Sequence, residues 1–339
     1  MTSFEVFKEE LHAYLSKEKN ILVTGHVSPD DDSTGSCLAA AHYINEYSAS
    51  KARVVYEGDE SNRWESFEGY DQVKFVDELP PHTKHYDACL FLDAHELSRF
   101  TNEDEFPLSK KAFCIDHHPI SDACSFETYW VDETRASTSD MVYDALYAEQ
   151  RVSSTGAEAM LLGILGDTGN FRYVGPENAE VFRVAEQLVS DAEIRIESLQ
   201  SRYGSIRGYA YDVFKKLISH SETIEVEGWP KMMCSYVAEE EVAPHNDAMR
   251  STGAHLFVSW PKRIEGVEWG FVLTPRSNDM VAASFRSLPG SVNVGDMAER
   301  LGIGGGHDRA SGGRFEDMTA EAAFEEVLSW MRNNEPRFS

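Results

Sequence analysis

The sequence has few cysteines, no long apolar run and little positive charge, and each shortage excludes a class of protein. Five cysteines (Cys37, Cys89, Cys114, Cys124 and Cys234) form no CxxC pair, and no Asn-x-Ser/Thr acceptor site occurs. We therefore expect reduced thiols in a cytoplasmic protein. No run approaches the roughly 20 apolar residues that span a bilayer. The acidic N-terminus lacks the basic start of a signal peptide, so we expect none.

Positive charge is scarce, because 31 Lys and Arg face 58 Asp and Glu, for a formal net charge of −27. This balance argues against adhesion to long nucleic acids or to anionic membranes. A polyanionic substrate would need local arginines or bound cations to attract it. The 339 residues, 42% of them hydrophobic, are enough for two folded domains.

The first half of the chain alternates short apolar runs with helical patterns. Strands are predicted at 21–26, 52–56, 73–77, 87–94 and 111–118, and helices near the N-terminus, from residue 34, at 137–150 and at 154–166. Such alternation predicts an α/β domain with a mostly parallel sheet flanked by helices. We assign residues 1–190 to this domain.

The second half changes character. Residues 177–220 look helical and polar, and we interpret 191–223 as a helical linker. Beyond it, residues 224–339 form a smaller predicted α/β domain. Strands of a mixed sheet are predicted at 231–237, 255–260, 268–275 and 280–287, followed by a Gly-rich loop at 302–313 and a helix at 319–332.

Asp and His side chains follow several of the predicted apolar elements. They are His26, Asp30, Asp32, Asp93, Asp116, His117 and Asp167. Each has a simpler explanation alone: Asp30 to Asp32, for instance, suit the cap of the next helix. Chemistry in parallel sheets nevertheless collects at the carboxyl ends of strands, so we expect these side chains to meet.

The ligand chemistry of this set points to divalent cations. Carboxylates and imidazoles without thiolates suit manganese, and to a lesser degree magnesium, cobalt or iron. The carboxylates exceed the need of one ion and suit two, about 3.5–4 Å apart, as in phosphoester hydrolysis. A carboxylate would bridge the ions, and a water between them would be the nucleophile.

Five segments then carry a family resemblance. HVSPDDD, LDAHELSR, IDHHP, GDTGNF and GGGHDRASGG occur in the order found in the DHH phosphoesterases that carry a DHH-associated C-terminal domain. The chain resembles most the oligoribonuclease and pAp phosphatase (nanoRNase) branch. The resemblance implies a first metal at His26 and Asp30, a second at Asp32, His117 and Asp167, and Asp93 bridging them.

The resemblance also implies roles for other residues. Asp116 would orient a histidine, and His118 would assist the leaving group or hold the phosphate, unless it is only packed. Substrate contacts would come from Arg99, Arg286, Ser287, Gly304, Gly305, Gly306 and His307. The chain departs from the family pattern at Ser311, where alanine is usual, and at Asp31, where glycine is common.

The leading hypothesis is a metal-dependent phosphodiesterase. It would cleave short oligoribonucleotides such as pApA to nucleoside 5′-monophosphates and dephosphorylate pAp as a further activity. The alternatives are a cyclic-dinucleotide (c-di-AMP) phosphodiesterase and an inactive nucleotide-binding sensor. The expected partners are short RNA or nucleotides, with no long nucleic acid and no membrane. Family members often form homodimers, but no feature of this sequence demands one.

Overall fold

The computed structural model describes residues 3–60, 63–101, 111–120, 124–203, 208–276 and 280–339. The chain forms two compact units, Met1–Ser205 and Ile206–Ser339. The predicted linker divides between them, because α7 (Ile196–Tyr203) belongs to the first unit and α8 (Gly208–Ser219) to the second. None of the described helices is both long and apolar enough to cross a membrane.

The first unit is built on a parallel sheet, as predicted. Its strands are β1 (Asn20–Thr24), β2 (Lys51–Glu57), β3 (Lys74–Val76), β4 (Ala88–Leu92), β5 (Lys111–Asp116) and β6 (Thr128–Val131). Their order is β3-β2-β1-β4-β5-β6, and every pairing is parallel. All five residues of β4 are buried, as expected of a strand with both faces covered.

Helices cover the two faces of this sheet unequally. The unit contains α1 (Phe4–Leu15), α2 (Asp31–Tyr47), α3 (Pro80–Thr83), α4 (Thr138–Val142) with the π-helical turn Tyr143–Tyr147, α5 (Ser154–Asp167), α6 (Val181–Ala192) and α7. Helices α1, α2, α4, α5 and α6 share one large core with the sheet. The opposite face packs a smaller aromatic cluster around Phe91, Phe100 and Phe126.

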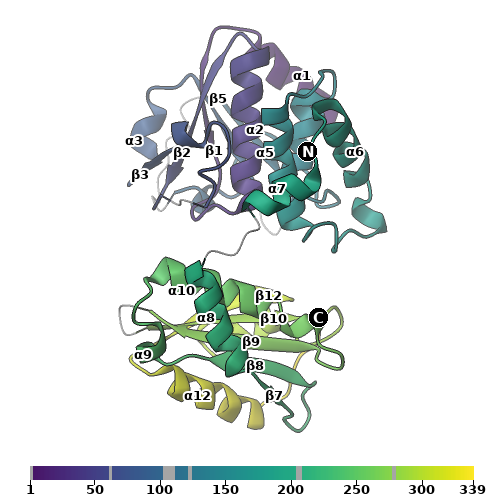
Figure 1. Cartoon of the computed structure of the whole chain (residues 1–339). Coiled ribbons are helices and arrows are strands. Elements are labelled where there is room, and N and C mark those ends of the chain that lie inside the picture. The colour runs from purple at the N-terminus through teal and green to yellow at the C-terminus, as the bar shows by residue number, and fades with distance from the viewer. Residues whose placement is uncertain (1–2, 61–62, 102–110, 121–123, 204–207, 277–279) are drawn as a thin grey trace. The chain divides into compact units, whose positions relative to one another are not determined.

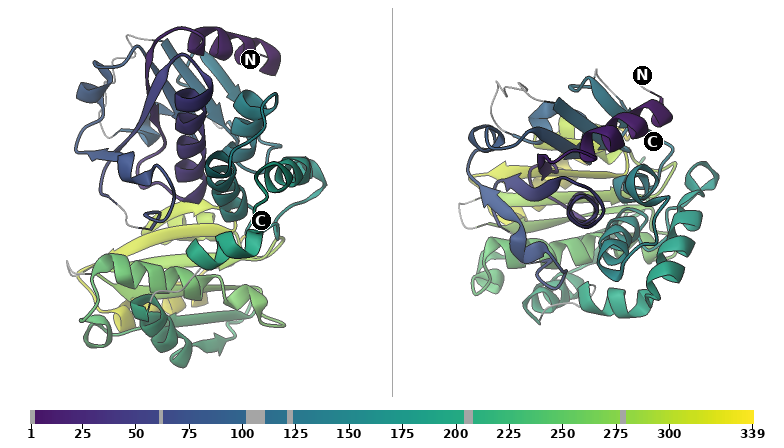
Figure 2. Two further views of the ribbon diagram at one scale, coloured as in Figure 1. Left: turned by 45° about the horizontal axis from the view of Figure 1, so that its top comes forward. Right: turned by 90° about the horizontal axis from the view of Figure 1, so that it is seen from above.

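Helices α2 and α5 lie side by side (Figures 1 and 2). Their close approach depends on glycine, because a Cβ at Gly35 would lie 2.4 Å from the carbonyl oxygen of Ala159. The two helices run in opposite directions: a Cβ at Gly166, near the end of α5, would meet Asp31, which begins α2. The start of α2 and the end of α5 therefore lie together.

The strand order places a topological switch point at the middle of the sheet. From β1 the chain adds β2 and β3 on one side, and then β4, β5 and β6 on the other. In open α/β sheets, ligands bind outside the carboxyl ends of the strands at such a switch point. Here the neighbours at that point are β1 and β4.

The second unit has a six-stranded mixed sheet, also as predicted. Its strands are β7 (Glu222–Ile224), β8 (Met232–Tyr236), β9 (Trp269–Pro275), β10 (Met280–Ser287), β11 (Gly304–His307) and β12 (Ala310–Glu316). Only the β8–β9 pairing is parallel among the described pairs. Its helices are α8, α9 (Glu239–Val242), α10 (Asp247–Val258), α11 (Val294–Arg300) and α12 (Ala320–Arg332). Helices α8 and α10 cover one face, and α12 the other (Figure 1).

Two predicted elements of this unit are wrong. Residues 255–260 are not a strand, because most of them belong to α10, which Asn246 caps and which packs Phe257 and Val258 against α8. The Gly-rich segment is not a loop, since it forms β11 and β12. Glycine propensity argues against a strand, but backbone pairing with β12 fixes Gly304 to His307 in one.

Candidate metal centre

The predicted ligands converge at the carboxyl edge of the first sheet. His26 lies two residues beyond β1, Asp93 directly follows β4, and His117 directly follows β5. Asp32 lies in the first turn of α2, and Asp167 is the last residue of α5. The antiparallel packing of these helices brings both carboxylates to the same strand ends.

A first cluster joins His26, Asp30 and Asp93. Nε2 of His26 lies 3.5 Å from Oδ2 of Asp93 and 3.9 Å from Oδ1 of Asp30. The Nδ1–H of the same ring donates to the carbonyl of Val27 over 2.9 Å, which leaves Nε2 for a ligand. Burial disfavours the imidazolium, but the two carboxylates outweigh it and raise the pKa of His26 to about 10.

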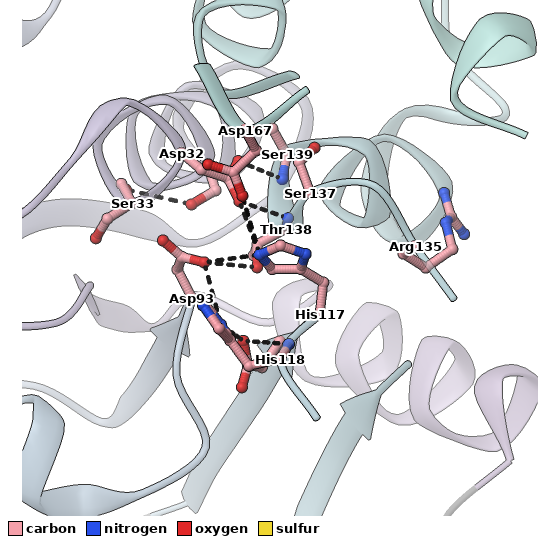
Figure 3. A network of polar contacts seen from close by, with 12 residues as sticks. Asp32, Ser33, Asp93, His117, His118, Arg135, Ser137, Thr138, Ser139 and Asp167 are labelled. Atoms are coloured by element: carbon pink, nitrogen blue, oxygen red, sulfur yellow. Dashed lines mark hydrogen bonds and ion pairs between the residues drawn. The ribbon is translucent and has the colours of Figure 1, made fainter. Parts of the chain in front are cut away.

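A second cluster joins Asp32, His117 and Asp167. Nε2 of His117 lies 3.0 Å from Oδ2 of Asp167 and 3.9 Å from Oδ2 of Asp32 (Figure 3). Burial and the neighbouring carboxylates raise the pKa of Asp32 well above its usual range. Burial also raises the pKa of Asp167, to about 6. These buried acids repel one another, and a cation would relieve that repulsion.

Asp93 faces both clusters. Its Oδ2 is directed to His26, whereas its Oδ1 lies 3.7 Å from Nε2 of His117. Its backbone φ of +67° is in the left-handed region, which is uncommon for a residue other than glycine. Such strained positions cluster at functional sites, where the surrounding structure holds them.

The donor set fits divalent metal ions. Nε2 of His117 is buried and makes no well-directed hydrogen bond with any residue in the described ranges, although carboxylate oxygens surround it. A buried imidazole nitrogen that faces several carboxylates is the arrangement expected of a metal ligand. Imidazole and carboxylate donors without sulfur suit manganese or a similarly hard ion.

A segment that supports this cluster carries no distinctive signal in the sequence. The N-terminus of α4 donates two backbone hydrogen bonds to Asp32, from Thr138 N at 2.6 Å and Ser139 N at 2.9 Å. The Thr138 hydroxyl donates to Oδ1 of Asp93 over 3.1 Å (Figure 3). The signal in the sequence is the run Ser137-Thr138-Ser139 before a helical pattern, which reads as an ordinary cap.

Asp116 holds two histidines instead of one. Its Oδ1 accepts from Nδ1–H of His118 over 2.8 Å, and its Oδ2 accepts from Nδ1–H of His95 over 2.5 Å. His95 is buried and was not singled out from the sequence. Burial alone would lower the pKa of His118, but its bond to Asp116 outweighs burial and raises it.

Asp30 and Asp31 both have structural roles. Asp30 caps α2, accepting from the backbone N–H groups of Asp32 and Ser33, and also faces His26. The capping explanation for Asp30 is therefore confirmed, and its assignment as a metal ligand stays a prediction. The unusual Asp31 points away from the clusters and accepts from Arg63 Nη2 at 2.6 Å and Trp64 Nε1 at 2.8 Å.

The predicted substrate residues are distributed over both units. In the first unit, Arg99 is exposed, and its carbonyl accepts from Val27 N beside His26. In the second unit, Arg286 is half-buried on β10, whereas Ser287 points to the opposite face and is buried.

The Gly-rich hairpin of the second unit is exposed along most of β11, from Gly304 to His307. Its close neighbour is α11, since a Cβ at Gly295 would lie 2.5 Å from the carbonyl oxygen of Gly306. The unusual Ser311 has a structural use, because its hydroxyl donates to the carbonyl of Val294 over 2.6 Å.

The chain is similar to known proteins in sequence and in fold. Residues 20–164 match the family model described as "DHH family, N-terminal domain". The chain is 29% identical to the bifunctional oligoribonuclease and PAP phosphatase NrnA of Thermus thermophilus, over 93% of this chain and 90% of that protein. It is 24% identical to the cyclic-di-AMP phosphodiesterase PdeA of Listeria monocytogenes, over 96% of this chain and 49% of that protein. A crystal structure of an exopolyphosphatase-related protein from Bacteroides fragilis shares the fold, with a TM-score of 0.84, 20% identity and 97% of both chains covered.

Proposed function

Because this chain is a DHH family phosphoesterase, we propose that it hydrolyses short oligoribonucleotides to nucleoside 5′-monophosphates with two divalent ions, preferably manganese. Dephosphorylation of pAp is proposed as a second activity of the same site. The similarity to an oligoribonuclease and PAP phosphatase over nine-tenths of both chains supports this choice of substrates.

One observation carries the proposal: the carboxylate of Asp93 belongs to the His26 cluster, and its other oxygen lies 3.7 Å from Nε2 of His117 in the second cluster. His26 and Asp30 would hold one ion, and Asp32, His117 and Asp167 the other, with Asp93 common to both. A sensor without catalysis would not need this arrangement. When bound, the two ions supply Lewis-acid stabilisation of phosphate charge and activation of water.

The remaining residues orient these groups and handle protons. Backbone N–H groups of Thr138 and Ser139 fix the Asp32 carboxylate. Asp116 holds Nδ1 of His118, so any proton that His118 delivers must come from Nε2. The raised pKa of His118 favours the imidazolium, which can donate to a phosphate oxygen or to the departing ribose oxygen.

Arg286 and the Gly-rich hairpin are proposed to bind substrate phosphate in the second unit. A guanidinium suits a phosphate oxyanion, and exposed glycine backbone allows its close approach. The similarity to a cyclic-dinucleotide phosphodiesterase favours c-di-AMP as a second candidate substrate for the same chemistry.

The test is hydrolysis of pApA by the full chain. The protein is stripped with chelator, reloaded with Mn²⁺, and assayed by chromatography for AMP release, with chelated protein as control. Metal-dependent AMP release is expected. Conversion of pAp to AMP, or of c-di-AMP to linear pApA, without cleavage of pApA would replace the proposed substrate. No hydrolysis of any of the three by folded, manganese-loaded protein would contradict the phosphodiesterase.

A further inference from the structure

The chain makes a strained left-handed turn directly after the metal-site residue Asp167. Gly169, Asn170 and Phe171 have φ values of +56°, +60° and +64°. Asparagine tolerates this region, but for phenylalanine it is unfavourable. A turn this costly persists only where neighbouring contacts hold it.

Several contacts hold the turn. The Thr168 hydroxyl accepts from Phe171 N over 2.9 Å, and Gln200 Nε2 donates to Asn170 Oδ1 over 2.5 Å. The ring of Phe171 stacks on that of Phe182, with centroids 5.4 Å apart and planes at 30°. The turn is therefore fixed from both the α5 side and the α6 and α7 side.

The turn brings an aromatic ring against the backbone that follows Asp167. The Tyr173 ring lies over Gly169, where an added Cβ would come within 2.5 Å of its Cε2 atom. Gly169 is two residues beyond Asp167, so their Cα atoms are less than about 7.6 Å apart. Although the ring lies against Gly169, Tyr173 is 50% exposed to solvent.

We infer that the Tyr173 ring is a stacking platform for a nucleobase of the substrate. The inference rests on the proposed function and refines it, because it names the part of the substrate that this rim of the site recognises. Aromatic rings stack with any base and therefore bind without strong sequence preference. A base-free polyphosphate has nothing to place on such a ring, so Tyr173 favours nucleotides over polyphosphate.

Under this inference, the strained turn preorganises the Tyr173 ring for binding. A tyrosine on a relaxed loop would lose side-chain and backbone freedom when a base stacked on it. Here the turn is already fixed by Thr168, Gln200 and Phe182, and Tyr173 N donates to the carbonyl of Thr168 over 2.9 Å, so the backbone that carries the ring is held before the substrate arrives. Preorganisation of this kind improves affinity without adding contacts.

The experiment compares Y173A and Y173F with wild-type, manganese-loaded full chain. Y47A is the matched control, since Tyr47 is a 39% exposed tyrosine at the far end of α2, about 22 Å along the helix from Asp32. Two readouts are taken: kcat and KM for pApA, and calorimetric Kd values for AMP and for base-free ribose 5-phosphate.

Y173A is expected to raise both the KM for pApA and the Kd for AMP by about tenfold, with kcat and the ribose 5-phosphate Kd within about twofold of wild type. Y173F, which keeps the ring, should restore wild-type values. The inference would be overturned if Y173A weakened the binding of AMP and of ribose 5-phosphate equally, or if it lowered only kcat. It would also be overturned if Y173A left KM and the Kd for AMP unchanged.

Failure of the proposed function gives a different result. If the wild-type protein does not cleave pApA, the proposed reaction fails, but the comparison of AMP with ribose 5-phosphate still reports on the ring. In that case, tighter binding of AMP that Y173A abolishes supports the platform. Absence of AMP binding to the wild-type protein would overturn it.

Discussion

The hydroxyl of Thr138 donates a hydrogen bond of 3.1 Å to Oδ1 of Asp93. This bond ties the start of α4 to the carboxylate that faces both clusters. T138V keeps the shape of the side chain and removes the donor, so we expect a drop of about 10- to 100-fold in Mn²⁺ affinity or turnover. T138S should retain most of both. If T138V had the same manganese affinity and turnover as the wild-type protein, the bond would not be what positions Asp93.

Removal of the shared carboxylate should have a larger effect. D93A is expected to lower kcat for pApA by about a thousandfold or more and to reduce bound manganese below two ions per chain. Metal analysis and chromatography measure both quantities. D71A, which removes an exposed carboxylate in the 3-10 turn Tyr70–Gln72, is the control. Full activity in D93A would refute a centre shared through Asp93.

Manganese affinity should rise with pH. With a pKa of about 10 in the metal-free protein, His26 is protonated at neutral pH and must lose that proton to bind an ion. The apparent association constant should therefore increase at least tenfold per pH unit between pH 6 and 8. Calorimetry in buffers of different ionisation enthalpy counts the released protons. A pH-independent affinity would contradict the assignment of His26 as a ligand.

The same pKa affects the stability of the metal-free protein. Because the folded pKa is raised above the unfolded value of about 6.5, the contribution of His26 is complete below pH 6.5 and is lost as the pH rises toward 10. Chelated protein should accordingly become less stable to urea between pH 7 and pH 9, and H26Q should reduce this dependence.

Asp31 should matter for stability more than for chemistry. Its Oδ1 accepts from the indole N–H of Trp64, whose side chain is buried. D31A leaves that N–H unpaired, at a cost of about 1–3 kcal/mol, and should lower the Tm of the metal-free chain by several degrees. D31N keeps a hydrogen-bond acceptor for Trp64, so its Tm should fall less. The ion pair of Asp31 with the exposed Arg63 contributes little to stability. If R63A lowered the Tm as much as D31A does, the ion pair and not the Trp64 hydrogen bond would explain the loss.

Arg286 should affect substrate binding. R286A is expected to raise the KM for pApA about tenfold or more, with a smaller change in kcat, because the phosphate loses a charged donor. R286K should recover part of the loss. R314A is the control, since Arg314 is an exposed arginine in the same sheet, on β12. An unchanged KM in R286A would exclude the proposed phosphate contact.

The sequence determined to a large extent the architecture and which Asp and His side chains lie together at the sheet edge. Apolar runs alternating with helical patterns indicate a parallel sheet, and polar residues at strand ends mark its functional edge. For His26, Asp93 and His117 this reasoning is reliable, because the carboxyl ends of neighbouring parallel strands must meet. Periodicity did not predict the secondary structure of 255–260 or of the Gly-rich hairpin. Packing against α8 makes the first segment helical, and pairing with β12 makes the second a strand.

Tertiary structure decided which remote side chains support the centre. Thr138 reaches Asp32 across 106 positions and His95 reaches Asp116 across 21, and neither spacing carries a signal of its own. The sequence likewise does not predict that the half-exposed ring of Tyr173 lies over Gly169, because the turn between them decides this. Local sequence indicates most of the strands and helices, whereas hydrogen bonds between distant segments depend on how those elements pack.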